Sequence, residues 1–215
     1  NTIGSNQLFT NFSSLSGTNK NFSYYTYYNY KIGDGFRNNS DFISNNLYTH
    51  LGYKIGDKTK ISGEISYLNY LAHQAGGLSD RMFSIDPMQS NRSRNWFGLD
   101  WLLFNIKIKH KFNSNSNLSF NFFGLDAERN SIGFRSNRVD QVDPFTERDL
   151  IKGKFNNHGL EIKFLNNYKF LNRKNVFVIG GKYYKSKSTS KQGPGSSLEN
   201  ADFNFYIEEY HNYTN

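Results

Sequence analysis

The sequence predicts an all-β fold, an antiparallel up-and-down meander of about eight long strands. Apolar and polar side chains alternate along many segments with a period of two, which is typical of strands. Aromatic residues make up 17% of the 215 residues, whereas all hydrophobic residues together reach only 36%. A soluble core packed with aliphatic side chains does not have this composition. Short turn-forming segments and long connections follow one another along the chain, which indicates a chain that runs back and forth.

The alternation and the turn residues place each strand. In chain order, we expect strands at residues 7–14, 20–32, 43–55, 59–70, 95–112, 117–127, 154–169 and 175–189. In residues 43–55 the apolar side chains, such as Ile43 and Leu51, occupy odd positions and the polar ones even positions. Residues 160–170 separate in the same way, so each of these strands has one apolar and one polar face.

The second expected strand contains the stretch NFSYYTYYNYK, residues 21–31. Four of its rings share one face with Thr26: Phe22, Tyr24, Tyr28 and Tyr30. Tyr25 and Tyr27 lie on the opposite face. Because a tyrosine ring is apolar with a polar tip, it suits the boundary between hydrocarbon and water. We therefore expect the four-ring face to meet lipid, and Tyr25 and Tyr27 to line the interior of a barrel.

Residues 95–112 do not alternate strictly. Their apolar side chains occupy odd positions up to Leu103 and even positions from Phe104. An extra residue in the strand would bring both sets onto one face. The sequence therefore predicts a β-bulge at Leu103 and Phe104.

The connections alternate between short and long. Four short segments rich in turn residues are expected to close hairpins: SGTN (16–19), GDKT (56–59), NSNS (113–116) and LNRKN (171–175). The long connections carry all three prolines: Pro87, Pro144 and Pro194. Short turns at one end and long loops at the other are typical of outer-membrane barrels, in which the short turns face the periplasm. A soluble β-sandwich is the alternative, but strands of about twelve residues or more are long for a sandwich.

Several classes of function are excluded. No run of about 18 apolar residues occurs and no charged-then-apolar leader opens the chain, so we expect neither a membrane-spanning helix nor a signal segment. The chain has no cysteine, which excludes disulfides and cysteine-ligated metals. Its five histidines are scattered, without metal-ligand or catalytic spacing, so we expect no enzyme activity. His50 and Glu64 are expected to face each other across neighbouring strands as a polar pair.

The net charge of +8 does not indicate a nucleic-acid partner. The basic residues collect at the end with the short turns, where they can meet anionic lipid headgroups. They include Lys54, Lys58, Lys60, Lys107, Lys109, Lys111, Lys169, Arg173 and Lys174.

Five segments resemble, in order, the barrel of TonB-dependent outer-membrane receptors. They are GDGFRNNS (33–40), YLAHQAGGLSDRMFSIDPMQSNRSRNWF (70–97), FFGLDAERNSIGF (122–134), ERDLIKGKFNNHG (147–159) and YYKSKSTSKQGPG (183–195). The likeness is greatest to the ferric (iron III) dicitrate receptor group of Bacteroidota-type bacteria. The stretch QSNRSRNW is its most specific part.

The resemblance implies a 22-stranded transmembrane β-barrel in the cell outer membrane that imports an iron chelate. It also implies an N-terminal plug domain and energy supplied by TonB and its inner-membrane motor. Iron would enter only as part of the transported chelate, so no resident cofactor is expected. Residues 1–215 lack the plug, and we interpret them as a partial β-barrel domain, an internal fragment that ends inside an extracellular loop.

Two alternatives stay open. The receptor could carry another cargo, such as a different siderophore or a glycan. The chain could also be a small closed eight-stranded barrel that transports nothing, which requires a hydrogen-bonded seam between residues 7–14 and 175–189.

Capture of an anionic chelate by arginine is the expected chemistry, because the guanidinium group grips carboxylates in pairs. Arg92 and Arg94 are the first candidates, with Arg81 next. The other candidates in the long connections are Arg37, Arg135, Arg138, Arg148, His73 and Gln74. The same loops carry about as many acidic residues, so ion pairs that fix loop shape are the alternative role for each arginine. No catalytic and no metal-ligating residue is expected.

Overall fold

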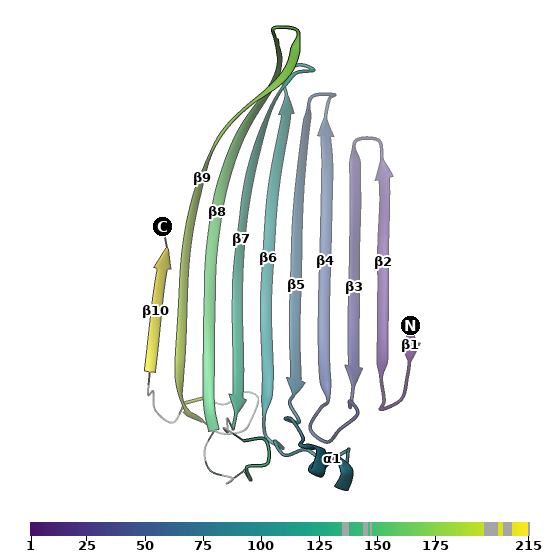
Figure 1. Ribbon diagram of the computed structural model, residues 1–215. Helices are drawn as coiled ribbons and strands as arrows, with labels where there is room; N and C mark the ends of the chain where they lie inside the picture. The colour runs from purple at the N-terminus through teal and green to yellow at the C-terminus, as the bar shows by residue number, and fades with distance from the viewer. Residues whose placement is uncertain (135–137, 144–145, 147, 196–201, 204–207, 215) are drawn as a thin grey trace.

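The computed structural model describes residues 1–134, 138–143, 146, 148–195, 202–203 and 208–214. In this part of the chain, ten strands form one antiparallel sheet in which chain neighbours are also spatial neighbours (Figure 1). The strands are β1 (Thr2–Ile3), β2 (Phe9–Asn19), β3 (Phe22–Gly33), β4 (Phe42–Ile55), β5 (Thr59–His73), β6 (Trp96–Lys111), β7 (Ser116–Gly133), β8 (Arg148–Phe170), β9 (Arg173–Gly195) and β10 (Glu208–Thr214). The predicted meander is confirmed.

Tight hairpins lie at one end of the sheet, the upper end in Figure 1, and the long connections lie at the other. Leu171 and Asn172 both have positive φ, 48° and 59°, as in the type I′ turns that match strand twist. The predicted turn at residues 16–19 is wrong. These residues continue β2, and the chain reverses at Lys20, where φ is 51°.

The long connection between β5 and β6 contains the only helix in the described residues, α1 (Asp80–Ile85). The Ser79 side chain accepts a hydrogen bond from the Met82 backbone N–H and so caps the first turn. With six residues, α1 is far too short to cross a bilayer, and no helix in the described ranges is long and apolar enough to do so.

The strands at the C-terminal side are longer than expected. β8 and β9 each have 23 residues, and β9 runs through Pro194 instead of ending before it. β10 occupies part of the segment expected to be a terminal loop, so that expectation is wrong for residues 208–214. Pro144 lies outside the described residues.

No β-bulge interrupts β6 in the described structure, so that prediction is wrong. Leu103 pairs with Ser66 and Leu125, and Phe104 pairs with Ile65 and Gly124, in ladders without a break. The two apolar sets of β6 therefore lie on opposite faces of the sheet. The polarity of the faces changes along the strand, and the backbone remains regular.

The register defines these two faces. We call face A the one that carries Phe104 and face B the one that carries Leu103. Towards the tight hairpins, face A forms an apolar band: Ile61, Ile65, Ile106, Ile108, Phe120, Phe122, Leu160, Ile162, Phe164 and Ile179. Face B at the same height is polar: Ser62, Glu64, Asn105, Lys107, Ser119, Asn121, Glu161 and Lys163. Beyond the band the distribution is reversed, with face A polar at Asp100, Asp126, Glu128 and Lys154 and face B apolar at Trp101, Leu103, Leu125 and Phe155. At the strand ends, the apolar Trp96, Ile132 and Leu150 lie on face A again.

Three glycines accommodate a ring from the neighbouring strand. Gly17, Gly124 and Gly159 are direct cross-strand partners of Tyr24, Phe104 and Phe123. A Cβ atom at Gly17 would lie 2.8 Å from the Tyr24 ring, and at Gly124 it would lie 2.8 Å from the Asn157 carbonyl oxygen. Such pairs pin the register of adjacent strands.

The most deeply buried side chains lie at the end of the sheet that carries the long connections. Trp96, Ile132 and Leu150 are consecutive cross-strand partners on β6, β7 and β8 and are almost fully buried. Leu71 and Phe203 pack against them. This cluster fixes the strand ends from which the loops leave.

The sheet has an open order in the described residues. β2 pairs with β1 and β3, and β9 pairs with β8 and β10. The seam between residues 7–14 and 175–189 that a closed eight-stranded barrel requires is therefore not formed in the structure.

Candidate ligand-binding site at the loop end

Arg37 ties the connection between β3 and β4 to the longer connection between β5 and β6. Its guanidinium donates to the carbonyl oxygens of Gly76 at 2.6 Å, of Gln89 at 2.8 and 3.0 Å, and of Ala75 at 3.4 Å. These charge-assisted bonds satisfy carbonyls on both sides of α1. The side chain is therefore engaged within the protein.

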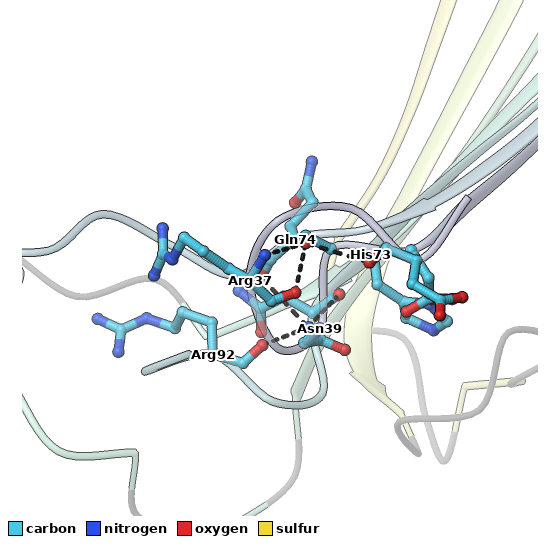
Figure 2. Close-up of polar contacts among 9 residues, drawn as sticks. Arg37, Asn39, His73, Gln74 and Arg92 are labelled. Carbon is cyan, nitrogen blue, oxygen red and sulfur yellow. Dashed lines mark hydrogen bonds and ion pairs between the residues drawn. The ribbon is translucent and has the colours of Figure 1, made fainter. Parts of the chain in front are cut away.

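Asn39 provides a second tie, next to Arg37 in Figure 2. Its φ of 55° lies in the left-handed region that asparagine tolerates. The side-chain amide donates to the carbonyl oxygens of Arg92 at 2.5 Å, Asn95 at 3.1 Å and Gln74 at 3.3 Å. Arg37 and Asn39, which both belong to the segment GDGFRNNS (33–40), thus bind backbone atoms of the neighbouring loop.

Arg92 is buried, with 6% of its surface exposed. Its guanidinium donates to the carbonyl oxygens of Asn91 at 2.6 Å and Gln141 at 3.3 Å. The guanidinium carbon also lies 5.0 Å from the centre of the Phe134 ring, a cation–π distance. Arg92 therefore joins the β5–β6 connection to the β7–β8 connection.

Arg94 makes an ion pair across the same two connections. Its Nη2 atom lies 3.2 Å from Oδ1 of Asp143, whose side chain is only 7% exposed. The Arg94 side chain is 25% exposed, so it is partly accessible from the surface. A carboxylate already occupies the position that a ligand carboxylate could take.

The remaining predicted arginines differ in exposure. Arg81 is exposed on α1. Arg138 is exposed and donates to both carboxylate oxygens of Asp140, at 3.1 and 2.9 Å, which lowers the pKa of the Asp140 carboxyl because the bonds favour its charged form. Arg148 is the first residue of β8 and pairs with Gly195. Arg135 lies outside the described residues.

His73 is the last residue of β5, and Gln74 begins the long connection to β6. His73 Nδ1 lies 2.8 Å from Asp41 Oδ2, so the imidazole links two strand ends. Gln74 is exposed, and its side chain points away from the loop contacts in Figure 2. Its backbone N–H donates to Asn95 at 2.9 Å.

Next to the long connections, face B carries an aromatic surface that the sequence did not indicate. Trp101 on β6, Ala127 on β7 and Phe155 on β8 are consecutive cross-strand partners. The exposed Arg129 places its guanidinium carbon 6.0 Å from the centre of the Phe155 ring. With Leu99 and Leu125, these residues line a shallow hollow. The change of parity at Leu103 and Phe104 was the signal for this surface.

Deeper on face B, His50 and Glu64 are direct cross-strand partners, as expected, with Nδ1 and Oε1 3.1 Å apart. Among the described residues, no group of three or more His, Asp or Glu side chains is arranged to hold a metal ion. The described part of the site offers guanidinium groups and aromatic rings.

This architecture matches long segments of solved receptor structures. The ferric citrate transporter FecA in its unliganded form superposes with a TM-score of 0.80 over 93% of this chain and 30% of FecA, at 16% identity. The ten-stranded antiparallel meander is the fold of the matching segment of FecA. BauA, the ferric preacinetobactin receptor of Acinetobacter baumannii, matches at a TM-score of 0.71 over 98% of this chain and 35% of BauA, at 11% identity. FpvA of P. aeruginosa, bound to a ferric pyoverdine, matches at 0.71 over 97% of this chain and 32% of FpvA, at 14% identity.

The chain therefore spans about a third of the length of the receptors it matches. At these identities the likeness concerns the fold. No protein-family model and no curated sequence matches the chain.

Proposed function

We propose that this chain forms part of the barrel of a TonB-dependent receptor that imports an iron chelate across the cell outer membrane. The observation that carries the proposal is a sheet with two different faces: face A has an apolar band, and face B is polar at the same height. The long connections at one end of this sheet are joined by hydrogen bonds. Face A would meet lipid, and face B would line the interior.

The partners follow from this placement. The polar part of face B would contact the receptor's own plug domain, and TonB with its inner-membrane motor would act through that plug. Iron would be part of the cargo and not a resident cofactor.

Ferric dicitrate is the first candidate cargo. The resemblance of the loop sequences supports it, as does the number of arginines near the mouth. Arg81 and Arg94 would contact chelate carboxylates, because the Arg81 residue is exposed and the Arg94 side chain is partly exposed. Arg94 would exchange Asp143 for the ligand. Arg37 and Arg92 would position the loops through their bonds to carbonyl groups.

Ferric dicitrate binding to the full-length protein that contains this chain tests the proposal. Calorimetry should show that Arg81→Ala and Arg94→Ala each raise Kd by about tenfold or more, since a hydrogen bond to a charged group contributes about 1.5–3 kcal/mol. Arg173→Ala is the matched control, because Arg173 is an exposed arginine at the tight-hairpin end of β9. Wild-type protein that does not bind ferric dicitrate would remove this cargo, and equal effects of all three substitutions would remove the arginine contacts.

The aromatic surface of face B favours a second candidate, a siderophore with aryl groups or a glycan. Trp101 and Phe155 offer ring faces on which flat or sugar groups can stack. Trp101→Ala should then weaken binding of a ferric catecholate or an oligosaccharide and leave ferric dicitrate binding unchanged.

A further inference from the structure

Three exposed lysines lie close together on face A, on the side of the apolar band that is nearer the long connections. Lys154 on β8 faces Thr189 on β9, and Lys187 faces Asn156. Lys185, the third, faces His158. Because direct partners share a face, these side chains belong to one surface, which we call the lysine patch.

The lysine patch begins where the apolar band ends. Tyr183 and Leu160 are cross-strand partners at the edge of the band that is nearer the long connections. Lys185 is two residues beyond Tyr183 on the same face, a step of about 7 Å along the strand. If the apolar band meets hydrocarbon, as the proposed function requires, the lysine patch lies at the height of the lipid headgroups, with Tyr183 at the interface.

The positive charge of this patch is only partly compensated within the protein. Lys154 has one acidic neighbour, Glu128, with Nζ and Oε2 3.5 Å apart, and both side chains are exposed. Lys187 lies over the Tyr213 ring at 5.7 Å. In the described part of the chain, no carboxylate lies within ion-pair distance of Lys185 or Lys187. Exposed lysines without a close counter-ion attract mobile or headgroup anions.

The neighbouring strands carry the opposite charge at this height. Asp100 on β6 and Asp126 and Glu128 on β7 lie on face A, next to the lysine side of the sheet. The headgroup level is therefore acidic along β6 and β7 and basic along β8 and β9. Charged residues that only keep a surface soluble need not be separated by sign between neighbouring strands, as they are here.

We propose that the lysine patch binds the phosphate groups of an anionic lipid in the outer leaflet. The inference rests on the proposed membrane placement of face A. The lipid's acyl chains would lie on the apolar band of β8 and β9, and its phosphates would meet Lys154, Lys185 and Lys187. The patch is on the face opposite to the interior, so it does not contact cargo.

Lipid retention by the full-length protein in non-ionic detergent tests this proposal. The probe is a bis-phosphorylated acylated disaccharide of the lipid A type, with phosphatidylcholine as the neutral reference, counted per protein by native mass spectrometry. The outward triple variant Lys154→Gln, Lys185→Gln, Lys187→Gln should weaken binding on the order of a hundredfold, at about fivefold per lysine near an anionic surface.

The matched control changes three exposed lysines on face B: Lys109→Gln, Lys163→Gln and Lys182→Gln. It removes the same net charge from the interior side, so binding should change less than about twofold. Single substitutions at Lys185 and Lys182, which are on the same strand and opposite faces, repeat the comparison with minimal effect on folding. Strand content by circular dichroism checks that the variants are folded.

Equal losses in the outward and inward variants would overturn the proposal, because they would indicate a general charge effect. Displacement of the lipid by inorganic phosphate alone would also overturn it, since the patch would then be an anion site without lipid specificity. Wild-type protein that binds chelate and not the phosphorylated lipid would remove the lysine patch and leave the proposed function standing. Protein that does not insert into lipid at all would remove the proposed function itself.

Discussion

At the scale of single residues, Arg37 and Asn39 show how a short connection fixes a long one. Their side chains donate to carbonyl groups of Gln74, Gly76, Gln89, Arg92 and Asn95, on both sides of α1. The sequence pattern placed these arginines in the long connections, but it could not predict which groups they contact. A backbone carbonyl is present at every position, so residue types do not identify the acceptor.

Arg37→Ala should loosen the connection between β5 and β6 without unfolding the sheet. Loss of the charged donor leaves buried carbonyl groups without a partner, which lowers the free energy of local opening by about 2 kcal/mol. This corresponds to about thirtyfold faster amide exchange in the loop. Hydrogen exchange of residues 74–95 would measure this. Arg81→Ala is the control, because Arg81 is exposed on α1 in the same connection. Unchanged exchange in Arg37→Ala would mean that the loop holds without this tie.

The ring-over-glycine pairs make a second residue-level prediction. An added methyl group in Gly124→Ala would meet the Phe104 ring and lie 2.8 Å from the Asn157 carbonyl oxygen, so we expect a loss of about 1–3 kcal/mol in unfolding free energy. Gly181→Ala has no atom within 4 Å of the added Cβ and should change stability by less than about 0.5 kcal/mol. Urea unfolding in lipid vesicles compares the two.

At the scale of elements, β6 shows why the sequence located the strands correctly. It also shows why the predicted β-bulge at Leu103 and Phe104 was wrong. The alternation of apolar and polar residues located eight strands, because it persists on either side of a point where the two faces exchange polarity. The faces exchange polarity between Leu103 and Phe104, and a sequence cannot distinguish this exchange from an inserted residue. The part of a strand beyond the hydrocarbon can face solvent on its outer side, so its apolar residues move to the inner side. For the same reason, β7, β8 and β9 extend further than alternation indicated.

β3 offers a direct test of which face meets lipid. Thr26 lies on face A near the middle of the strand, where its hydroxyl lies 2.9 Å from the Thr49 hydroxyl. Thr26→Arg should cost about 2–4 kcal/mol, the range for arginine near the bilayer midplane. Asn29→Arg places the same side chain on face B of the same strand and should cost about 1 kcal/mol or less. A larger cost at Asn29 would mean that the faces are reversed.

At the scale of the whole molecule, the structure divides into an apolar band and a part beyond it. Residues 1–215 contain no cysteine, so a single cysteine introduced here carries the only label in this part of the protein. Spin labels at Ile106 and Ile162, on the band, should be accessible to oxygen and protected from a water-soluble relaxant. Labels at Lys154 and Lys187 should show the reverse. Equal accessibility at all four positions in lipid would contradict the membrane placement of face A.

The candidate site could be anticipated only in outline. The segments with long connections and arginines were located from the sequence, and these connections do meet at one end of the sheet. Arg94 forms an ion pair with Asp143, which was the alternative role expected for the loop arginines. The aromatic surface around Trp101 and Phe155 was not predicted. Both depend on which distant segments come together, and this is decided by register between strands that composition does not specify.

The ties made by Arg37 and Asn39 have a consequence for how such a receptor can diversify. They bind main-chain atoms of the connection between β5 and β6, so these particular ties do not depend on the side chains there. Arg92 and Arg94 make side-chain contacts of their own to the next connection, and the exposed positions between the ties are the ones that can be replaced. The loop's shape and its chemical preference can therefore change independently. A descendant of this chain could acquire a new cargo through substitutions at exposed positions of residues 74–95, while the ties that hold the connection stay as they are.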